Sequence, residues 1–189
     1  MMAVRVHGRG GQGVVTTAEL LAAAAFRDGR HAQAVPSFGS ERTGAPVQAT
    51  CRIDDAPIRG HEPVEAPDVV VVQDPTLLHQ VAVFEGLRPG GLALVNSART
   101  AHELGLNPLI EHAAVRTVPA TDIARRVIGR PLPGAPLLGA LAALEGLVSI
   151  AALEAVWRER FAGTVGEANA AAARAAFDRE RERAHAAPA

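Results

Sequence analysis

The chain has 189 residues, 48% of them hydrophobic and 21% charged, so it can bury a core and is not a disordered segment. With a formal net charge of −1 and 3% aromatic residues, it has no basis for binding nucleic acid or an anionic membrane. We find no apolar run long enough to span a bilayer and no signal peptide, and we expect a soluble, cytoplasmic protein.

Two residue types are scarce enough to exclude whole classes of site. All 19 basic residues are Arg, which excludes a Walker A phosphate loop and a Schiff-base lysine. Cys51 is the only cysteine, so this chain cannot by itself ligate an iron–sulfur cluster or build a cysteine zinc site. The seven His residues include no i, i+4 pair near an acid, so we expect no metal site. Any redox centre must then lie on another chain.

The first third of the chain predicts strands around one helix. Residues 4–7 form a short strand, a glycine-rich turn follows, and 12–27 carry an apolar helical face. A second strand is expected at 31–35. Apolar and polar residues then alternate over 47–53, which is typical of a half-buried strand and places Cys51 on the apolar side as an inert thiol. A turn at 54–57 follows, so a hairpin or edge excursion interrupts the alternation of strands and helices.

From residue 67 onward the alternation resumes, and the last third reads as helical. Four consecutive Val residues at 69–72 indicate a strand covered on both faces. The remaining expected elements are a helix at 76–84, strands at 92–95 and 114–118, a short helix at 121–128, a Gly/Pro linker at 129–136, and helices at 137–147, 151–161 (with Ser149 as N-cap) and 167–186. We therefore predict an α/β fold, Rossmann-like, whose mostly parallel sheet has a hairpin or edge insertion after the second strand and a C-terminal helical tail. Residues 1–189 should form a single domain, with the sheet core at about 1–128 and the tail at about 137–187.

The glycine-rich turn fits the G-x-G-x-x-G spacing at Gly8, Gly10 and Gly13 between a strand and a helix. A dinucleotide site also needs an acid about 20 residues later, and the first one after the second strand is Glu41. The NAD interpretation therefore lacks its second half. Backbone amides at the helix start can still favour an anion. Alternatively, the glycines serve a tight turn and close helix–sheet packing, in which case a side chain at Gly13 would push the helix off the sheet.

Three other features are candidates for binding. The segment 36–46 carries Ser37, Ser40, Glu41, Arg42 and Thr43 between glycines, and can bind an anion, dock a partner, cap a helix or simply be a solvated turn. Asp74 and Asn96 follow strands at the sheet rim where ligands lie in open α/β sheets, although Asp74 can instead cap a helix. Gln12 either caps its own helix or points across the turn.

Taken together, these segments resemble a known family. GRGGQGVVTTAELLAAAA, VPSFGSERTGAPVQATCRI, APDVVVVQD and GGLALVNS occur in the order found in the gamma subunit of 2-oxoacid:ferredoxin oxidoreductases, and are most similar to the pyruvate type. The likeness runs over about residues 4–169. Two positions depart from the family pattern: Gly134 stands where an Asn is usual, and Thr43 where a second basic residue is often found.

The resemblance implies a function that this chain does not carry out alone. The complex would convert pyruvate or a related 2-oxoacid and coenzyme A into an acyl-CoA, carbon dioxide and reduced ferredoxin. Thiamine diphosphate and the iron–sulfur clusters would be held by the alpha, beta and delta subunits, with no cofactor and no catalytic residue on this chain. The gamma chain would organise the complex and help to receive coenzyme A. The candidate cofactor-binding or interface residues are Gly8, Gly10, Gly11, Gln12, Gly13, Ser37, Ser40, Glu41, Arg42, Asp74 and Asn96.

Two alternatives remain open at this point. The first is a free-standing oxidoreductase that binds NAD or FAD, against which the missing acid speaks. The second is the beta subunit of an indolepyruvate:ferredoxin oxidoreductase, although the PSFGSERTG form of the second loop favours the pyruvate-type branch.

Overall fold

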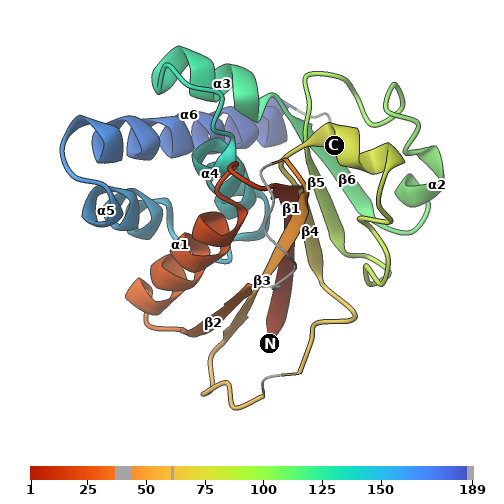
Figure 1. The fold of residues 1–189 in the computed structure, drawn as a ribbon, viewed down its shortest axis with the longest axis horizontal. Helices are drawn as coiled ribbons and strands as arrows, with labels where there is room; N and C mark the ends of the chain where they lie inside the picture. The colour runs from red at the N-terminus through yellow and green to blue at the C-terminus, as the bar shows by residue number, and fades with distance from the viewer. Residues whose placement is uncertain (37–43, 61, 187–189) are drawn as a thin grey trace.

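The computed structural model describes residues 1–36, 44–60 and 62–186, and these contain one six-stranded sheet of order β2-β3-β1-β4-β5-β6 (Figure 1). Its strands are β1 Met2–Arg9, β2 His31–Pro36, β3 Pro46–Asp54, β4 Val69–Val72, β5 Leu92–Asn96 and β6 Ala114–Val118. β3 pairs antiparallel with both β2 and β1, while β1, β4, β5 and β6 pair in parallel. The predicted mostly parallel sheet, with a hairpin insertion after the second strand, is confirmed.

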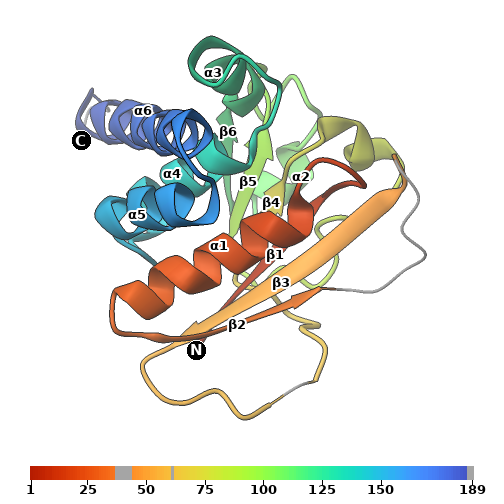
Figure 2. The same cartoon turned by 60° about the vertical axis from the view of Figure 1, so that its left-hand side comes forward.

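The longer helices gather on one face of the sheet (Figure 2). The helical elements are α1 Val14–Arg27, the 3-10 helix η1 Pro75–His79, α2 Asn107–Ile110, α3 Ala120–Val127, α4 Gly134–Glu145, α5 Ile150–Arg160 and α6 Thr164–Ala186. The main core lies between the sheet and α1, α3, α4, α5 and α6. A smaller core on the opposite face is formed by β4 and β5 with the connections that follow them.

The strand β4 shows why its sequence is a continuous apolar run. Val69 and Val71 face the main core, while Val70 and Val72 face the smaller one, and all four are completely buried. A strand with helices on one face and packed connections on the other has no solvated side for polar residues. The alternating strand β3 buries its apolar residues Ala49, Cys51 and Ile53 as predicted, but Arg52 on the polar side is buried as well. Burial raises the pKa of the Cys51 thiol to about 12.

The helix predicted at 76–84 is confirmed only in its first part. Asp74 caps the 3-10 helix η1, which ends at His79, and the chain then continues in reverse turns. A buried guanidinium explains the difference, because Arg5 on β1 donates to the main-chain carbonyls of Val83 and Glu85. The same turns bury Leu77 and Val83 in the smaller core. A tertiary contact therefore overrides the local helical pattern.

The other differences concern helix boundaries. α1 begins at Val14 rather than at residue 12, because Gly13 has a left-handed φ of 73°. α4 begins at Gly134, inside the predicted linker, and the short α2 was not expected. Ser149 is confirmed as an N-cap, since its side chain accepts a hydrogen bond from the Ala152 amide. None of the helices in the described residues has both the length and the apolar character that a bilayer span requires.

Candidate functional site

The site is centred on the glycine loop, residues 10–13, which joins β1 to α1 at the carboxyl end of the parallel strands (Figure 1). Gly11 and Gly13 have φ of 91° and 73°, a region that residues with a Cβ rarely adopt. The loop is hydrogen-bonded to the two residues that precede β3, because the Gly10 amide donates to Ala45 O over 2.9 Å and the Gly44 amide donates to Gly10 O over 3.2 Å. The sequence-distant residues 44 and 45 therefore belong to the same site.

The packing role predicted for Gly13 is wrong. A Cβ at Gly13 would meet nothing within 4 Å, so this glycine is required for its backbone conformation alone. Close packing instead falls on Gly8, where a Cβ would lie 2.6 Å from Val14 Cγ2. The first glycine of the motif thus permits the helix–strand contact, and the last permits the turn.

Gln12 points across the loop rather than capping its own helix. Its Oε1 accepts from the Arg9 amide over 2.8 Å, and its Nε2 donates to Asp74 Oδ2 over 2.8 Å. Asp74 caps η1, as its alternative interpretation expected, and also binds the loop. Burial favours the neutral form of Asp74, but hydrogen bonds from Thr76 and Gln12 and the charge of Arg9 outweigh it and lower the pKa of its carboxyl.

Asn96 is buried and bonded within the protein at both ends of its amide. Its Nδ2 donates to Gln73 O over 2.7 Å and to Thr121 Oγ1 over 2.8 Å, and its Oδ1 accepts from the Thr121 amide. Gln73 in turn donates to Thr17 Oγ1 over 2.7 Å, and Thr17 donates to Gly13 O over 2.9 Å. A continuous polar chain therefore runs from α3 to the glycine loop, with Asn96 inside it rather than presented to a ligand.

Two cavities lie against the glycine loop. The smaller, of about 320 Å³, lies toward β3 and is lined by Gly10, Gly11, Val15, Thr16 and Val47 among others. The larger, of about 390 Å³, lies toward the helical tail, and its lining includes Thr16, Arg130, Gly134, Trp157, Phe161 and Asn169. The first residues of α1 and α4 both lie beside the larger cavity. The two helices are in close contact there, since a Cβ at Gly134, the first residue of α4, would lie 2.6 Å from Thr17 Oγ1 on α1.

The lining of the larger cavity includes both hydrogen-bond donors and two aromatic rings. Neither α1 nor α4 has a side-chain N-cap, so the first amides of α1 and the Gly134 and Ala135 amides of α4, whose third residue is Pro136 without an amide hydrogen, keep free hydrogens and a partial positive charge. Within the part of the chain that the structure describes, the exposed Arg130 guanidinium has no partner, and the buried Trp157 Nε1 has no acceptor. Trp157 stacks on Phe161 with ring centroids 5.6 Å apart. This arrangement suits a phosphorylated ligand that also has an apolar or ring portion.

The structure brings together part of the predicted site. Gly8, Gly10, Gly11, Gln12, Gly13 and Asp74 form one cluster, and Asn96 joins it through Gln73. Ser37, Ser40, Glu41 and Arg42 lie outside the described residues. Sequence reasoning missed Arg9, Arg130 and Trp157. The only signal was the Gly/Pro-rich stretch around Arg130, which was interpreted as a linker rather than as the start of a helix.

The sheet order separates this site from a dinucleotide fold. β3 lies between β1 and β2, so the end of β2 is two strands away from the glycine loop. In the dinucleotide fold these strands are neighbours, and the acid after the second one reaches the ribose. Among the described residues, no group of three or more His, Cys, Asp or Glu side chains could hold a metal ion.

Comparison with known proteins identifies a family with this mostly parallel α/β fold. Residues 3–179 match the family model described as pyruvate ferredoxin/flavodoxin oxidoreductase, and the chain belongs to this family. It is 46% identical over 179 residues to the pyruvate/ketoisovalerate oxidoreductases common subunit gamma of Thermococcus litoralis, covering 95% of this chain and 97% of that one. It is 48% identical, over the same shares of both chains, to the pyruvate synthase subunit PorC of Methanothermobacter marburgensis.

A solved structure of a relative has the same architecture. The pyruvate oxidoreductase subunit PORC of Thermotoga maritima superposes with a TM-score of 0.80 at 38% identity, over 94% of this chain and 95% of that one. The similarity thus extends over nearly the whole length of both chains and is of the gamma type, as the order of the sequence segments predicted.

Proposed function

We propose that this chain is the gamma subunit of a multi-subunit 2-oxoacid:ferredoxin oxidoreductase of the pyruvate type. The observation that carries this is the identity of 46% and 48% to gamma-type subunits over 95% of the chain. The complex would oxidatively decarboxylate the 2-oxoacid, transfer the acyl group to coenzyme A and pass the two electrons to ferredoxin. The chain works with other subunits, and we assign to them, as alpha, beta and delta, the centres that this chain lacks.

The residues of this chain do not fit the cofactors of that reaction. Iron–sulfur clusters need several thiolates, and the one cysteine is buried with the pKa of its thiol raised to about 12. The described residues likewise offer no group of acids and histidines for the metal ion that accompanies a diphosphate cofactor. The clusters and thiamine diphosphate are therefore proposed to reside on the partner subunits, in the cytoplasm with the rest of the complex.

Coenzyme A is the substrate that this chain is equipped to contact. The free amides at the starts of α1 and α4, together with the Arg130 guanidinium, would hold a phosphate group. The Trp157 and Phe161 rings supply an apolar wall beside that anion site. Arg42, outside the described residues, stays a sequence-based candidate for the same phosphate or for a carboxylate of a partner.

Reconstitution tests the assignment as a subunit. The alpha, beta and delta subunits are purified without this chain, and coenzyme A-dependent ferredoxin reduction by pyruvate is measured before and after the chain is added back. We expect activity only in the complete mixture. Full activity without this chain would overturn the proposal. Micromolar binding of NAD(H) by the purified chain would instead favour the free-standing oxidoreductase.

A variant pair tests the anion site. In the complete complex, Arg130→Ala should raise the KM for coenzyme A about tenfold with little change in kcat, because it removes one charge-assisted contact made equally in ground and transition states. Arg126→Ala is the control, since Arg126 is an exposed arginine near the end of α3 that does not line the cavity. An equal KM in the two variants would show that Arg130 does not contact coenzyme A.

A further inference from the structure

We infer that Asp74 and Arg9 are positioning residues, which hold the glycine loop and the start of β3 in the one arrangement that binds coenzyme A. The inference rests on the proposed function, because it takes coenzyme A as the ligand of the loop. It assigns to Asp74 a role that differs from direct contact with ligand or partner. Arg9 also lines the smaller cavity beside the glycine loop, so it transmits the position of Asp74 to that cavity.

The carboxylate of Asp74 is fully used within the protein. Oδ1 accepts from the Thr76 amide over 3.0 Å and from Thr76 Oγ1 over 2.6 Å. Oδ2 accepts from Gln12 Nε2 over 2.8 Å and from Arg9 Nε over 3.2 Å. Two carboxylate oxygens offer about four acceptor sites, so none is left for a ligand. The side chain is only 14% exposed, which makes each of these bonds costly to lose.

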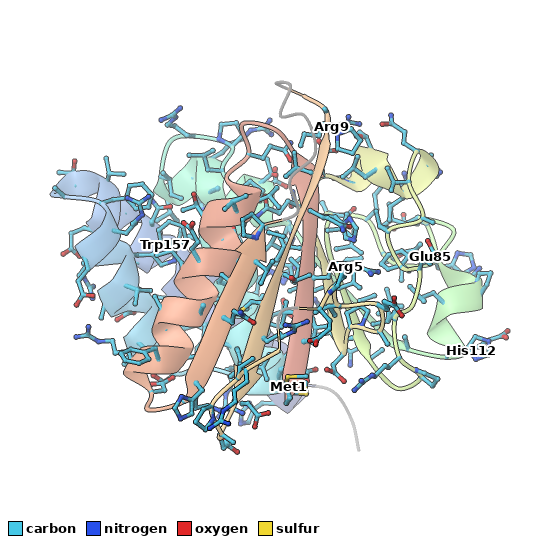
Figure 3. All side chains as sticks on the ribbon, turned by 60° about the horizontal axis from the view of Figure 1, so that its bottom comes forward. Met1, Arg5, Arg9, Glu85, His112 and Trp157 are labelled. Carbon is cyan, nitrogen blue, oxygen red and sulfur yellow. The ribbon has the colours of Figure 1, made fainter. Side chains whose placement is uncertain are left out.

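The guanidinium of Arg9 links Asp74 to Gly44, two residues before the start of β3. Nη1 donates to Gly44 O over 3.0 Å, while Nη2 donates to Thr76 Oγ1 over 2.7 Å and to Gln80 Oε1 over 2.8 Å. Arg9 stands at the end of β1 opposite to Met1 (Figure 3), where the strand passes into the glycine loop. One planar group thus joins β1 to two segments that are distant in sequence, Gly44 and the 3-10 helix η1, as the fixed fork of an arginine allows.

These contacts make the loop and its two neighbours one unit. Gly10 exchanges main-chain hydrogen bonds with both Gly44 and Ala45, so a shift of Gly44 would move the loop amides. Asp74 does not line either cavity beside the loop. Its effect on a ligand must therefore pass through Gln12 and Arg9. Positioning of this kind alters affinity without adding a contact.

Asp68 provides a matched control, because it lies at the other end of β4 from Asp74. Asp68, just before β4, accepts from Arg88 Nη1 over 2.9 Å and from the Ala3 amide over 2.8 Å. Its side chain is 17% exposed, close to the value for Asp74. Asp68→Asn therefore removes the same kind of ion pair from the edge of the sheet that is remote from the glycine loop.

The experiment compares Asp74→Asn with Asp68→Asn in the complete complex, measuring kcat and the KM for coenzyme A and for pyruvate. For Asp74→Asn we expect the KM for coenzyme A to rise about tenfold, with kcat and the KM for pyruvate within about twofold of the wild type. Asp68→Asn should leave all three within about twofold. Arg9→Lys keeps the charge but loses the fork, and should raise the same KM severalfold, which keeps the inference testable if Asp74→Asn does not assemble.

A double variant that exchanges donor and acceptor in the hydrogen bond between residues 12 and 74 provides a second readout. In the double variant Gln12→Glu/Asp74→Asn, the new carboxylate can accept from both the Arg9 amide and the Asn amide, whereas Arg9 Nε loses the oxygen that it binds at Asp74. We expect the KM for coenzyme A to fall below that of Asp74→Asn without returning fully to the wild-type value. A general loss of stability would not be repaired by exchanging donor and acceptor.

Several results would overturn the inference: an unchanged KM in Asp74→Asn, an equal rise in Asp68→Asn, a fall in kcat alone, or no rescue by the double variant. If Arg130→Ala raises the KM for coenzyme A while Asp74→Asn does not, only this inference fails. If neither variant changes it and the complex is active without the chain, the proposed function fails as well.

Discussion

At the scale of single residues, Gly8 and Gly13 belong to one motif, but glycine is required at each position for a different physical reason. Gly13 has a left-handed φ of 73° and open space around its missing Cβ. Gly13→Ala should therefore lower the free energy of unfolding by about 1–2 kcal/mol through backbone strain alone. Gly13→Asn should cost clearly less, because Asn tolerates this conformation. Urea unfolding of both variants tests the account, and an Asn variant no more stable than the Ala variant would contradict it.

A substitution at Gly8 should destabilise the protein through steric crowding instead. A Cβ there would lie 2.6 Å from Val14 Cγ2, and Val14 is buried in the main core. We expect Gly8→Ala to lower the free energy of unfolding by about 1–3 kcal/mol. Gly8→Ala in a Val14→Ala background should cost less than it does alone, because truncation of Val14 leaves room for the added methyl group. Additive losses in urea unfolding would indicate that strain elsewhere is responsible.

His7 predicts how stability depends on pH. It is buried on β1 and accepts a hydrogen bond from Arg5 Nε over 3.1 Å, so burial and the Arg5 charge lower the pKa of its imidazole from 6.5 to about 4. The folded state thus binds the proton more weakly than the unfolded state does. Its contribution to stability is complete above about pH 6.5, is lost as the pH falls, and levels off below about pH 4.

Comparing two pH values isolates this contribution. Between about pH 7.5 and about pH 5, the wild type should lose about 2 kcal/mol more free energy of unfolding than His7→Gln, which keeps an acceptor for Arg5 but does not titrate. Urea unfolding at both pH values provides the measurement. An equal loss in the two proteins would show that carboxylates elsewhere, not His7, determine the acid sensitivity.

At the scale of elements, the Ser149 hydroxyl is one of the contacts that join α1 to α5, beside the Ser149 amide bound to Asp28 and the Arg27–Glu159 ion pair. Ser149 Oγ accepts from the Ala152 amide over 3.0 Å and donates to Asp28 Oδ1 over 2.7 Å, so it caps α5 and ties it to the end of α1. Ser149→Ala should lower the free energy of unfolding by about 1–2 kcal/mol. Ser149→Thr keeps the hydroxyl and serves as the control. Equal melting temperatures for all three proteins would refute the capping role.

The sequence predicted those elements whose side-chain pattern is local. The Val run of β4, the alternation of β3 and the Ser149 cap are each visible within a few residues, and each is confirmed. The helix expected at 76–84 ends at His79 because Arg5, 78 residues before Val83, binds the carbonyls of Val83 and Glu85. No periodicity within the segment records such a partner.

The candidate site follows the same rule. The glycine loop and Asp74 were found because a motif and a strand end are local signals. Arg130 and Trp157 were missed because they reach the loop only once α4 and α5 pack on α1. Arg9 was missed for a similar reason, since its two acceptor segments, Gly44 and the 3-10 helix η1 with its caps, meet only after the sheet has formed. Sequence patterns therefore locate the centre of the site but not its walls.

At the scale of the whole molecule, the helical tail forms part of the core. α4 is buried over its first nine residues, between the sheet and α6. Its contact with α6 is so close that a Cβ at Gly139 would lie 1.9 Å from Ala173 O. Residues of the sheet and of the tail helices belong to the same main core, to which the tail contributes Leu137, Leu141 and Leu153. We therefore propose that residues 1–189 unfold as one cooperative unit.

Trp157 makes that proposal testable, since it is the one Trp of the sequence and lies in α5 within the tail. Its fluorescence reports on the tail, whereas far-ultraviolet circular dichroism reports on all helices and strands together. We expect the two thermal transitions of the wild type to coincide, as a two-state domain requires. Gly139→Ala, which forces α4 and α6 apart, should lower both melting temperatures together by about 4–10 °C. A fluorescence transition that precedes the dichroism transition, in either protein, would mean that the tail separates from the sheet before the sheet unfolds.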